Sequence, residues 1–126
     1  MRLLLDTATF IWAAASPERL SKKALSALQS EEAVCEISAI SLSELAIKQA
    51  IGKLTFRRED ALAAISDLQV RVLPYTAEHA YQLFILPYHH SDPFDRQIIA
   101  QALGEKVPVV TSDRKFRLYR GLDVIW

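Results

Sequence analysis

Short apolar runs alternate with longer amphipathic segments along the whole chain. A short apolar run is typical of a buried strand, whereas apolar positions three and four residues apart are typical of a helix. The first pattern predicts strands at Arg2–Leu5, Ala33–Ile37, Val70–Leu73, Val107–Val110 and Leu122–Ile125. The second pattern predicts helices between them, at residues 9–15, 21–29, 41–51, 58–68, 76–86 and 93–103.

The alternation of strands and helices indicates the fold class. Two strands joined by a crossover helix pair in parallel in the same sheet. Apolar strands throughout the chain indicate a sheet that is buried on both faces. We therefore expect an α/β fold, a three-layer α/β/α sandwich with a short, mainly parallel central sheet. The 126 residues suffice for one such domain, spanning 1–126, with a core of its own.

Several helix ends carry residues that favour caps. Ser41 and Glu44 have the spacing of a capping box. Asp92 followed by Pro93 is typical of an N-cap and a first helical residue. Gly104 is expected to end the helix that begins at Pro93.

Four acids fall at the carboxyl edge of the predicted sheet, where ligands bind in folds of this class. Asp6 closes the first strand, and Asp113 directly follows the fourth. Glu44 and Asp95 lie in the first turns of two of the predicted helices. Taken singly, three of them have structural explanations: a capping box for Glu44, the helix dipole for Asp95, and a cap on residues 114–118 for Asp113. Asp6 is harder to explain in this way, because a carboxylate beside a buried strand needs a partner.

Together, the four acids point to a metal ion. Carboxylates crowded at one edge repel each other and stay ionised only if a cation neutralises them. No lysine or arginine is obviously dedicated to all four. Mg²⁺ and Mn²⁺ prefer oxygen ligands, and such a site activates water and stabilises displacement at phosphorus. The acids therefore predict metal-dependent phosphodiester chemistry.

Four segments resemble, in order and spacing, the acidic motifs of the PIN-domain family. They are Leu3–Thr7, Ser41–Leu45, Asp92–Ala102 and Thr111–Asp113. The third, with its Asp-Pro-Phe-Asp-Arg run, is the most specific. With the size of the chain, it is most similar to the VapC-type toxins of bacterial toxin–antitoxin pairs. The resemblance covers essentially the whole chain.

The resemblance implies a ribonuclease that requires Mg²⁺ or Mn²⁺, with Asp6, Glu44, Asp95 and Asp113 holding the metal. A metal-bound water would attack an RNA phosphodiester and leave a 5′-phosphate and a 3′-hydroxyl. Toxins of this kind dimerise and are inhibited by a cognate antitoxin. We accordingly expect a homodimer, an RNA substrate and an antitoxin partner.

The third motif leaves one ligand assignment open. It holds two aspartates one helical turn apart, and many PIN domains have an aspartate where this chain has Arg96. We favour Asp95 as the ligand and Asp92 as the cap, with Asp92 as the alternative ligand. The hydroxyls of Thr7 and Ser112 either orient ligands or waters, as in the family, or serve as turn and cap hydroxyls.

Basic residues beside the acids are candidates for holding RNA. Arg96 would stabilise phosphate charge, although a salt bridge to a neighbouring carboxylate is an equal alternative. Arg114 and Lys115 would contact the RNA backbone, or else belong to a solvated surface. A proton-transfer role for His89 or His90 is a weaker hypothesis, because metal-activated water requires no histidine.

Composition and charge restrict the alternatives. Fifteen Lys and Arg balance fifteen Asp and Glu, so no overall basic field attracts nucleic acid. The single cysteine, Cys35, excludes an internal disulfide framework. No apolar run approaches the roughly 18 residues of a membrane span, and Asp6 interrupts the apolar start too early for a signal peptide. We expect a soluble, cytoplasmic protein.

Two other functions compete with the nuclease. A phosphatase of the haloacid-dehalogenase kind needs an aspartate two residues after the first, and Ala8 occupies that position. A catalytically silent PIN-like interaction module is compatible with the neutral charge, but the full set of acids argues against it. The glycines are isolated, which excludes P-loop and dinucleotide-binding motifs.

Overall fold

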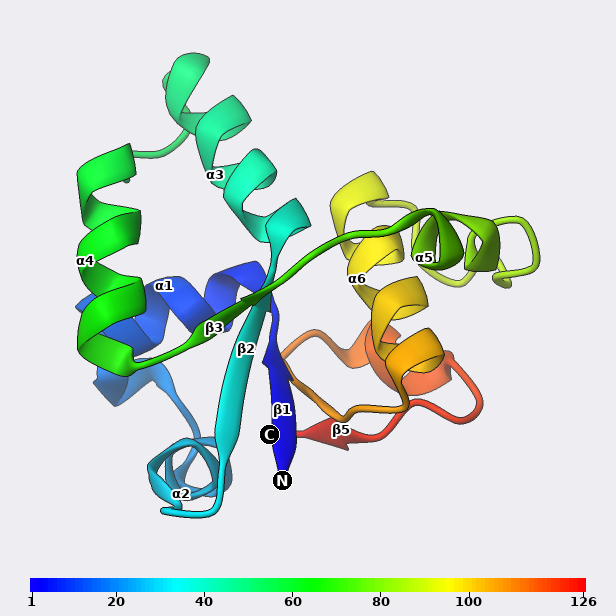
Figure 1. Cartoon of the computed structure of the whole chain (residues 1–126), viewed down its shortest axis with the longest axis horizontal. Coiled ribbons are helices and arrows are strands. Elements are labelled where there is room, and N and C mark those ends of the chain that lie inside the picture. Colours follow the sequence, from blue (N-terminus) through cyan, green and yellow to red (C-terminus); the bar gives the residue numbers. More distant parts are fainter.

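The computed structural model describes every residue, Met1–Trp126, and its strands form one five-stranded sheet (Figure 1). The strand order is β3-β2-β1-β4-β5, and all four neighbouring pairs are parallel. The strands are β1 (Arg2–Leu5), β2 (Val34–Ser38), β3 (Arg71–Leu73), β4 (Val109–Val110) and β5 (Val124–Ile125). The predicted parallel central sheet is therefore confirmed.

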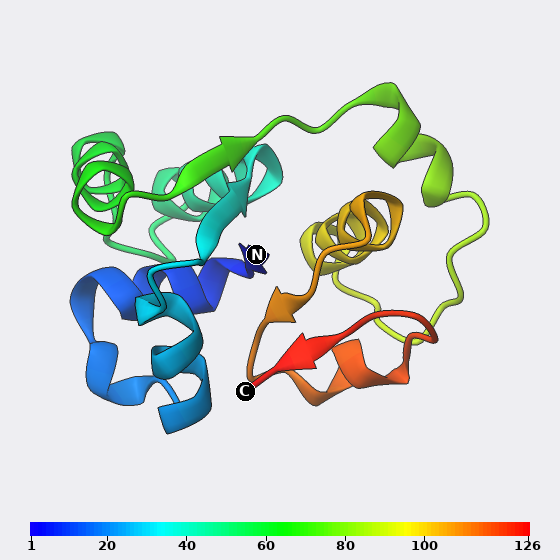
Figure 2. The same cartoon turned by 60° about the horizontal axis from the view of Figure 1, so that its bottom comes forward.

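Helices cover both faces of this sheet. They are α1 (Thr7–Ala15), α2 (Lys22–Gln29), α3 (Ala39–Ala50), α4 (Arg58–Leu68), α5 (Ala77–Gln82) and α6 (Pro93–Glu105), with 3₁₀ helices η1 (Pro17–Arg19) and η2 (Arg114–Leu118). Helices α1, α2 and α4 lie on one side, and α5 and α6 on the other (Figure 1, Figure 2). Helix α3 contacts both α1 and α6. None of the helices combines the length and apolar character that crossing a membrane requires.

Strand β1 is buried because its side chains serve cores on both faces of the sheet. Successive residues of a strand point to opposite faces. Leu4 packs on the α6 side with Val109, while Leu3 and Leu5 pack on the side of α1 and α2. All three leucines are at most 1% exposed. The central position of β1 places Asp6 in the middle of the carboxyl edge.

The predicted start of α3 is wrong by two residues. The Ser38 hydroxyl at the end of β2 accepts the Ile40 N–H, so the helix begins directly after the strand. Glu44 consequently lies in the second turn rather than the first. Ser41 is inside the helix, and the predicted capping box of Ser41 and Glu44 does not form.

The predicted ends of α5 and α6 also differ from the structure. Helix α5 ends at Gln82 rather than at residue 86, because the N–H groups of residues 84–86 bond three residues back instead of four. Helix α6 continues through Gly104 to Glu105. Its left-handed terminal residue is Lys106, with a φ of 57°.

Replacing Leu4 by alanine tests the double-sided core. Because Leu4 is 0% exposed, Leu4→Ala should lower the free energy of unfolding by about 2–5 kcal/mol. Leu62→Ala, at a side chain that is 50% exposed, should change it by about 0.5 kcal/mol or less. Urea denaturation followed by circular dichroism measures both. Equal effects of the two substitutions would contradict this account of the core.

Candidate metal centre

The carboxyl ends of the central strands bring the predicted acids together. Asp6 follows β1 directly, and Asp113 lies three residues after the end of β4. Glu44 lies on α3, which starts where β2 ends, and Asp95 lies in the first turn of α6, which packs against α3. The carboxylates of Asp92, Asp6, Glu44 and Asp113 all act on the pKa of Asp95 through their charges. The four predicted ligands therefore lie in one acidic region, in which Asp95 and Asp113 are at ligand distance of one another and Asp6 and Glu44 lie farther out.

Asp6 is nearly buried and is held by two hydrogen bonds. Its Oδ1 accepts the Thr9 N–H at 2.9 Å, which caps α1, and its Oδ2 accepts the Thr111 hydroxyl at 2.6 Å. Thr111 in turn accepts the Asp113 N–H at 3.0 Å. Burial raises the pKa of Asp6, and the bonds from Thr111 and Thr9 oppose that rise. These contacts lock the end of β1 to the end of β4.

Glu44 has one paired and one unpaired carboxylate oxygen. Oε2 accepts a hydrogen bond from the Lys48 ammonium one helical turn later, and this bond raises the pKa of Lys48. Oε1 is buried and has no hydrogen-bond partner. A buried acceptor without a partner is costly. A bound cation would supply the missing partner.

The two aspartates of the third motif have different environments. Asp92 Oδ1 accepts the N–H groups of Phe94 and Asp95, each at 2.9 Å, so its predicted role as the N-cap of α6 is confirmed. Burial, together with the charges of the other acids, raises the pKa of Asp95 to about 8. Asp92 is therefore the N-cap of α6, and Asp95 is the aspartate of this motif whose carboxylate the burial and the other acids perturb.

A histidine completes the cluster. His90 Nε2 lies 2.7 Å from Asp113 Oδ2 and 3.1 Å from Asp95 Oδ2. Ligand-type atoms of these three residues all lie within 4.8 Å of one another. Asp113 Oδ1 accepts the Lys115 N–H and so caps η2, as predicted.

The hydroxyl contacts differ from the expectation at one position. Ser112 is exposed, and the hydroxyl that binds an acid belongs to its neighbour Thr111. Thr7 donates a hydrogen bond at 2.9 Å to the fully buried Ser41, which ties α1 to α3. Thr7 thus acts between the helices that carry Asp6 and Glu44.

Arg96 does not form the salt bridge to a neighbouring carboxylate that was its alternative prediction. Its guanidinium donates hydrogen bonds to the carbonyl oxygens of Leu86, Pro87 and His90 and lies 4.5 Å from the ring centroid of Tyr88. The side chain thus braces the loop before α6 and forms no salt bridge with an acid. Its Nη1 and Nη2 atoms donate to these loop carbonyls, and its predicted contact with RNA stays a prediction.

Two basic side chains stay free beside the acids. Arg114 and Lys115 are exposed and follow Asp113 directly. Their placement is compatible with contacts to an RNA backbone.

Sequence reasoning missed Lys48 and Thr111 and gave His90 a minor role. The spacing of Glu44 and Lys48, four residues apart in a helix, was a visible signal for an ion pair. The roles of Thr111 and His90 depend on how β4 and the loop before α6 pack against other elements. No local pattern in the sequence reveals that packing.

The residues fit a hard divalent cation. The cluster offers carboxylate oxygens from Asp6, Glu44, Asp95 and Asp113, which are the ligands that Mg²⁺ and Mn²⁺ prefer. The unpaired Glu44 Oε1 and the raised pKa of Asp95 both indicate that the cluster lacks a positive charge. A divalent cation would bind the unpaired Glu44 oxygen and would lower the pKa of Asp95 again.

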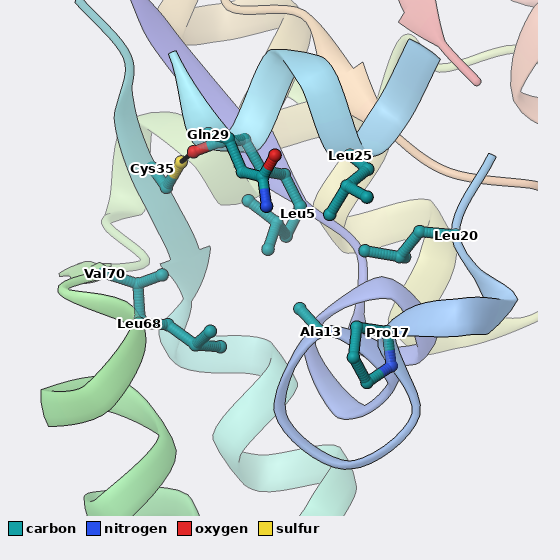
Figure 3. Close-up of a pocket in the computed structure, with 10 residues that line it drawn as sticks. Leu5, Ala13, Pro17, Leu20, Leu25, Gln29, Cys35, Leu68 and Val70 are labelled. Atoms are coloured by element: carbon teal, nitrogen blue, oxygen red, sulfur yellow. Dashed lines mark hydrogen bonds between the residues drawn. The ribbon is translucent and has the colours of Figure 1, made fainter. Parts of the chain in front are cut away.

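An apolar hollow lies apart from these acids. It measures about 180 Å³, and eight of its ten lining residues are hydrophobic. Figure 3 shows Leu20, Leu25 and Ala13 on one side of it and Leu68 and Val70 on the other. No residue of the acidic cluster lines it. The hollow is therefore a separate surface of the molecule.

Comparison with known proteins settles the family. A sequence model of the PIN domain matches residues 3–122. The chain belongs to the PIN-domain family. It is 34% identical over 126 residues to Ribonuclease VapC22 of Mycobacterium tuberculosis, covering 94% of this chain and 92% of that protein. This similarity confirms the resemblance to VapC-type members.

Solved structures share the fold of this PIN domain. VapBC2 from Rickettsia felis, bound to a promoter DNA fragment, matches with a TM-score of 0.74 and 18% identity over 98% of this chain and 97% of that one. VapBC-1 from nontypeable Haemophilus influenzae matches with a TM-score of 0.64 and 21% identity, over 98% and 96% of the two chains. At these identities the similarity establishes the common fold.

The raised pKa of Asp95 predicts how stability depends on pH without metal. An unfolded aspartate ionises near pH 4, whereas Asp95 in the folded protein ionises near pH 8. Between these values the folded state holds more protons, so the free energy of unfolding falls as pH rises. In EDTA at pH 8, Asp95→Asn should be more stable than wild type by about 1–3 kcal/mol.

Urea denaturation at pH 5 and pH 8, in EDTA, measures this effect. Asp67→Asn, at an exposed aspartate on α4, is the matched control and should follow the wild type at both pH values. An Asp95→Asn protein that loses as much stability as wild type between pH 5 and pH 8 would contradict the assignment.

Proposed function

We propose that this PIN-domain protein is an endoribonuclease and the toxin of a toxin–antitoxin pair. It hydrolyses RNA phosphodiesters with Mg²⁺ or Mn²⁺ held by Asp6, Glu44, Asp95 and Asp113. The observation that carries the proposal is the convergence of four carboxylates on Asp95, whose pKa rises to about 8. The relative from M. tuberculosis is named a ribonuclease, which supports RNA as the substrate.

The chain prepares the oxygen ligands before any cation binds. When bound, the cation activates a water molecule and offsets negative charge on the phosphate. The Thr9 N–H and the Thr111 hydroxyl fix the orientation of Asp6. Lys48 holds one oxygen of Glu44 and leaves the other for the cation. Orientation of ligands by such outer contacts is a common requirement for metal affinity.

Local positive charge, rather than overall charge, serves RNA binding in this proposal. The chain has a formal net charge of zero. Arg114 and Lys115 are exposed next to Asp113 and are suited to contact phosphates on either side of the scissile bond. Contacts of this kind position the backbone without reading the base sequence.

Cleavage of total bacterial RNA tests the proposed activity. Wild-type protein should cleave RNA in the presence of Mg²⁺ or Mn²⁺, and the cleavage should stop when EDTA is added. Asp6→Asn should lower the rate at least about 100-fold, because a metal site supplies several kcal/mol of transition-state stabilisation. Asp67→Asn, at the exposed aspartate on α4, should keep full activity. Gel analysis of the fragments measures all of these rates.

Two results would contradict the proposal. Cleavage that survives Asp6→Asn would mean that another site or a contaminant is responsible. An absence of cleavage by folded, antitoxin-free protein with either metal would favour an interaction module without catalysis.

A cognate antitoxin is the second part of the proposal. Solved structures with this fold include VapBC from Salmonella typhimurium bound to DNA and VapBC-5, which is described as a toxin–antitoxin system member from M. tuberculosis. We assign the apolar hollow of Figure 3, eight of whose ten lining residues are hydrophobic, to contact with such a partner. We place both proteins in the cytoplasm.

A homodimer is the third part, and an exposed apolar patch supports it. Tyr81, Phe84, Ile85 and Tyr88 are 59%, 87%, 76% and 73% exposed and follow each other at the end of α5. Monomeric proteins seldom leave large apolar side chains adjacent and uncovered. We assign this patch to the contact with a second copy of the chain.

Charge placed in the patch should separate the dimer. Ile85→Asp should raise the dimer dissociation constant at least about 10-fold, since a buried interface anchor contributes about 2 kcal/mol or more. Leu118→Asp, at a side chain that is 58% exposed on η2, is the matched control and should leave the dissociation constant unchanged. Light scattering over a concentration series gives both values. A dimer that tolerates Ile85→Asp would contradict the assignment of the patch.

A further inference from the structure

The position of the His90 ring is set by contacts outside the acidic cluster. Its side chain is 7% exposed. The ring packs edge-on against Phe116, with centroids 5.8 Å apart, and the backbone N–H donates to the Tyr119 hydroxyl at 2.9 Å. None of these contacts involves a carboxylate. The core around η2 therefore places the ring at the edge of the cluster.

The two nitrogens of this ring have different roles. Nδ1 lies 3.1 Å from the backbone nitrogen of Asp92, whose N–H only donates. Nδ1 accordingly accepts and carries no proton, so Nε2 carries the ring proton. Nε2 donates it to Asp113 Oδ2 at 2.7 Å, with Asp95 Oδ2 at 3.1 Å.

This tautomer makes His90 a donor rather than a metal ligand. A ligating nitrogen needs its lone pair, and a ligating histidine ordinarily donates its other N–H to an acceptor. At His90 the other nitrogen already accepts the Asp92 N–H. Although its ring lies within ligand distance of Asp95 and Asp113, its contribution is a hydrogen bond to Asp113 and a close contact with Asp95.

We propose that His90 is a positioning residue of the metal centre, whose Nε2–H holds the carboxylates of Asp113 and Asp95 facing one another. The inference rests on the proposed metal-dependent function. Asp113 Oδ1 is fixed by the Lys115 N–H, so the bond from His90 to Oδ2 sets the remaining rotation of that carboxylate. For the Asp95 side chain, His90 provides the one polar contact within the protein.

A neutral donor suits this position better than a cation. The acids around Asp95 repel one another when they are ionised. A lysine or arginine between Asp95 and Asp113 would hold them, but its charge would compete with the metal. The imidazole N–H orients the Asp113 carboxylate through a hydrogen bond and lies against the Asp95 carboxylate, without placing a lysine or arginine between them.

Mn²⁺ binding measured by isothermal titration calorimetry tests the role of His90. His90→Ala should weaken Mn²⁺ binding by about 10- to 100-fold, the usual effect of removing a contact that orients a ligand. His90→Gln keeps a side-chain N–H donor and should recover most of the affinity. His89→Ala is the matched control, because the adjacent exposed ring contacts Tyr119 and no acid. Its affinity should equal that of wild type.

Cleavage rates separate positioning from proton transfer. A positioning role predicts that His90→Ala needs more Mn²⁺ but approaches the wild-type kcat, within a few-fold, at saturating Mn²⁺. A kcat that stays low at every Mn²⁺ concentration, with unchanged Mn²⁺ affinity, would mean that His90 acts on the reaction itself and would overturn the inference.

The remaining outcomes are distinct. Unchanged Mn²⁺ affinity in His90→Ala, even with a lower Tm, would mean that the ring only packs the loop. If His90→Ala does not fold, His90→Leu, which retains apolar contact with Phe116 and lacks the donor, gives the same comparison. Wild-type protein that binds no Mn²⁺ would refute the proposed function as well, whereas unchanged affinity in the variants would overturn this inference alone.

Discussion

Mutual repulsion between carboxylates at the carboxyl edge of the sheet is the constraint on which the site depends. Burial, together with the charges of the surrounding acids, raises the pKa of Asp95 to about 8. Hydrogen bonds from groups other than lysine or arginine hold two of these acids. Asp6 accepts from the Thr9 N–H and the Thr111 hydroxyl, and Asp113 accepts from His90. Neutral donors fix geometry without cancelling charge. The cluster therefore keeps a strong demand for a cation.

Helix capping and metal binding are compatible roles of the same carboxylate here. Asp6 caps α1 through Oδ1, and Asp113 caps η2 through Oδ1. In each, the other oxygen belongs to the cluster, where Thr111 and His90 bond to it. Because a carboxylate oxygen has two lone pairs, these bonds leave acceptor sites for a cation. Capping thus orients the proposed ligands. An aspartate that caps a helix can therefore also be a metal ligand.

The sequence predicted those parts of the structure that depend on local pattern. Apolar runs located β1 and β4, and parallel pairing then placed Asp6 and Asp113 at one edge. The start of α3 was misjudged because Ser38 and Ser41 are both plausible caps, and only the junction with β2 selects Ser38. The choice between Thr111 and Ser112 likewise depends on the pairing of β4 with β1.

The loop before α6 shows why the role of Arg96 could not be assigned from sequence. Arg96 follows Asp95 directly, yet its guanidinium turns away to the carbonyl oxygens of Leu86, Pro87 and His90. By bonding these carbonyl oxygens, Arg96 fixes the loop that carries His90. It therefore affects the position of the acids through His90 and not through its own charge.

The same arrangement has a consequence for the order of binding in the proposed reaction. With Arg96 turned away, Lys48 is the one basic side chain paired with a cluster acid, and the edge of the sheet stays electronegative. A polyanion such as RNA is repelled by such an edge. A divalent cation must therefore reduce this negative charge before the phosphate can enter. In the proposed reaction, the metal therefore contributes to substrate affinity as well as to the chemical step.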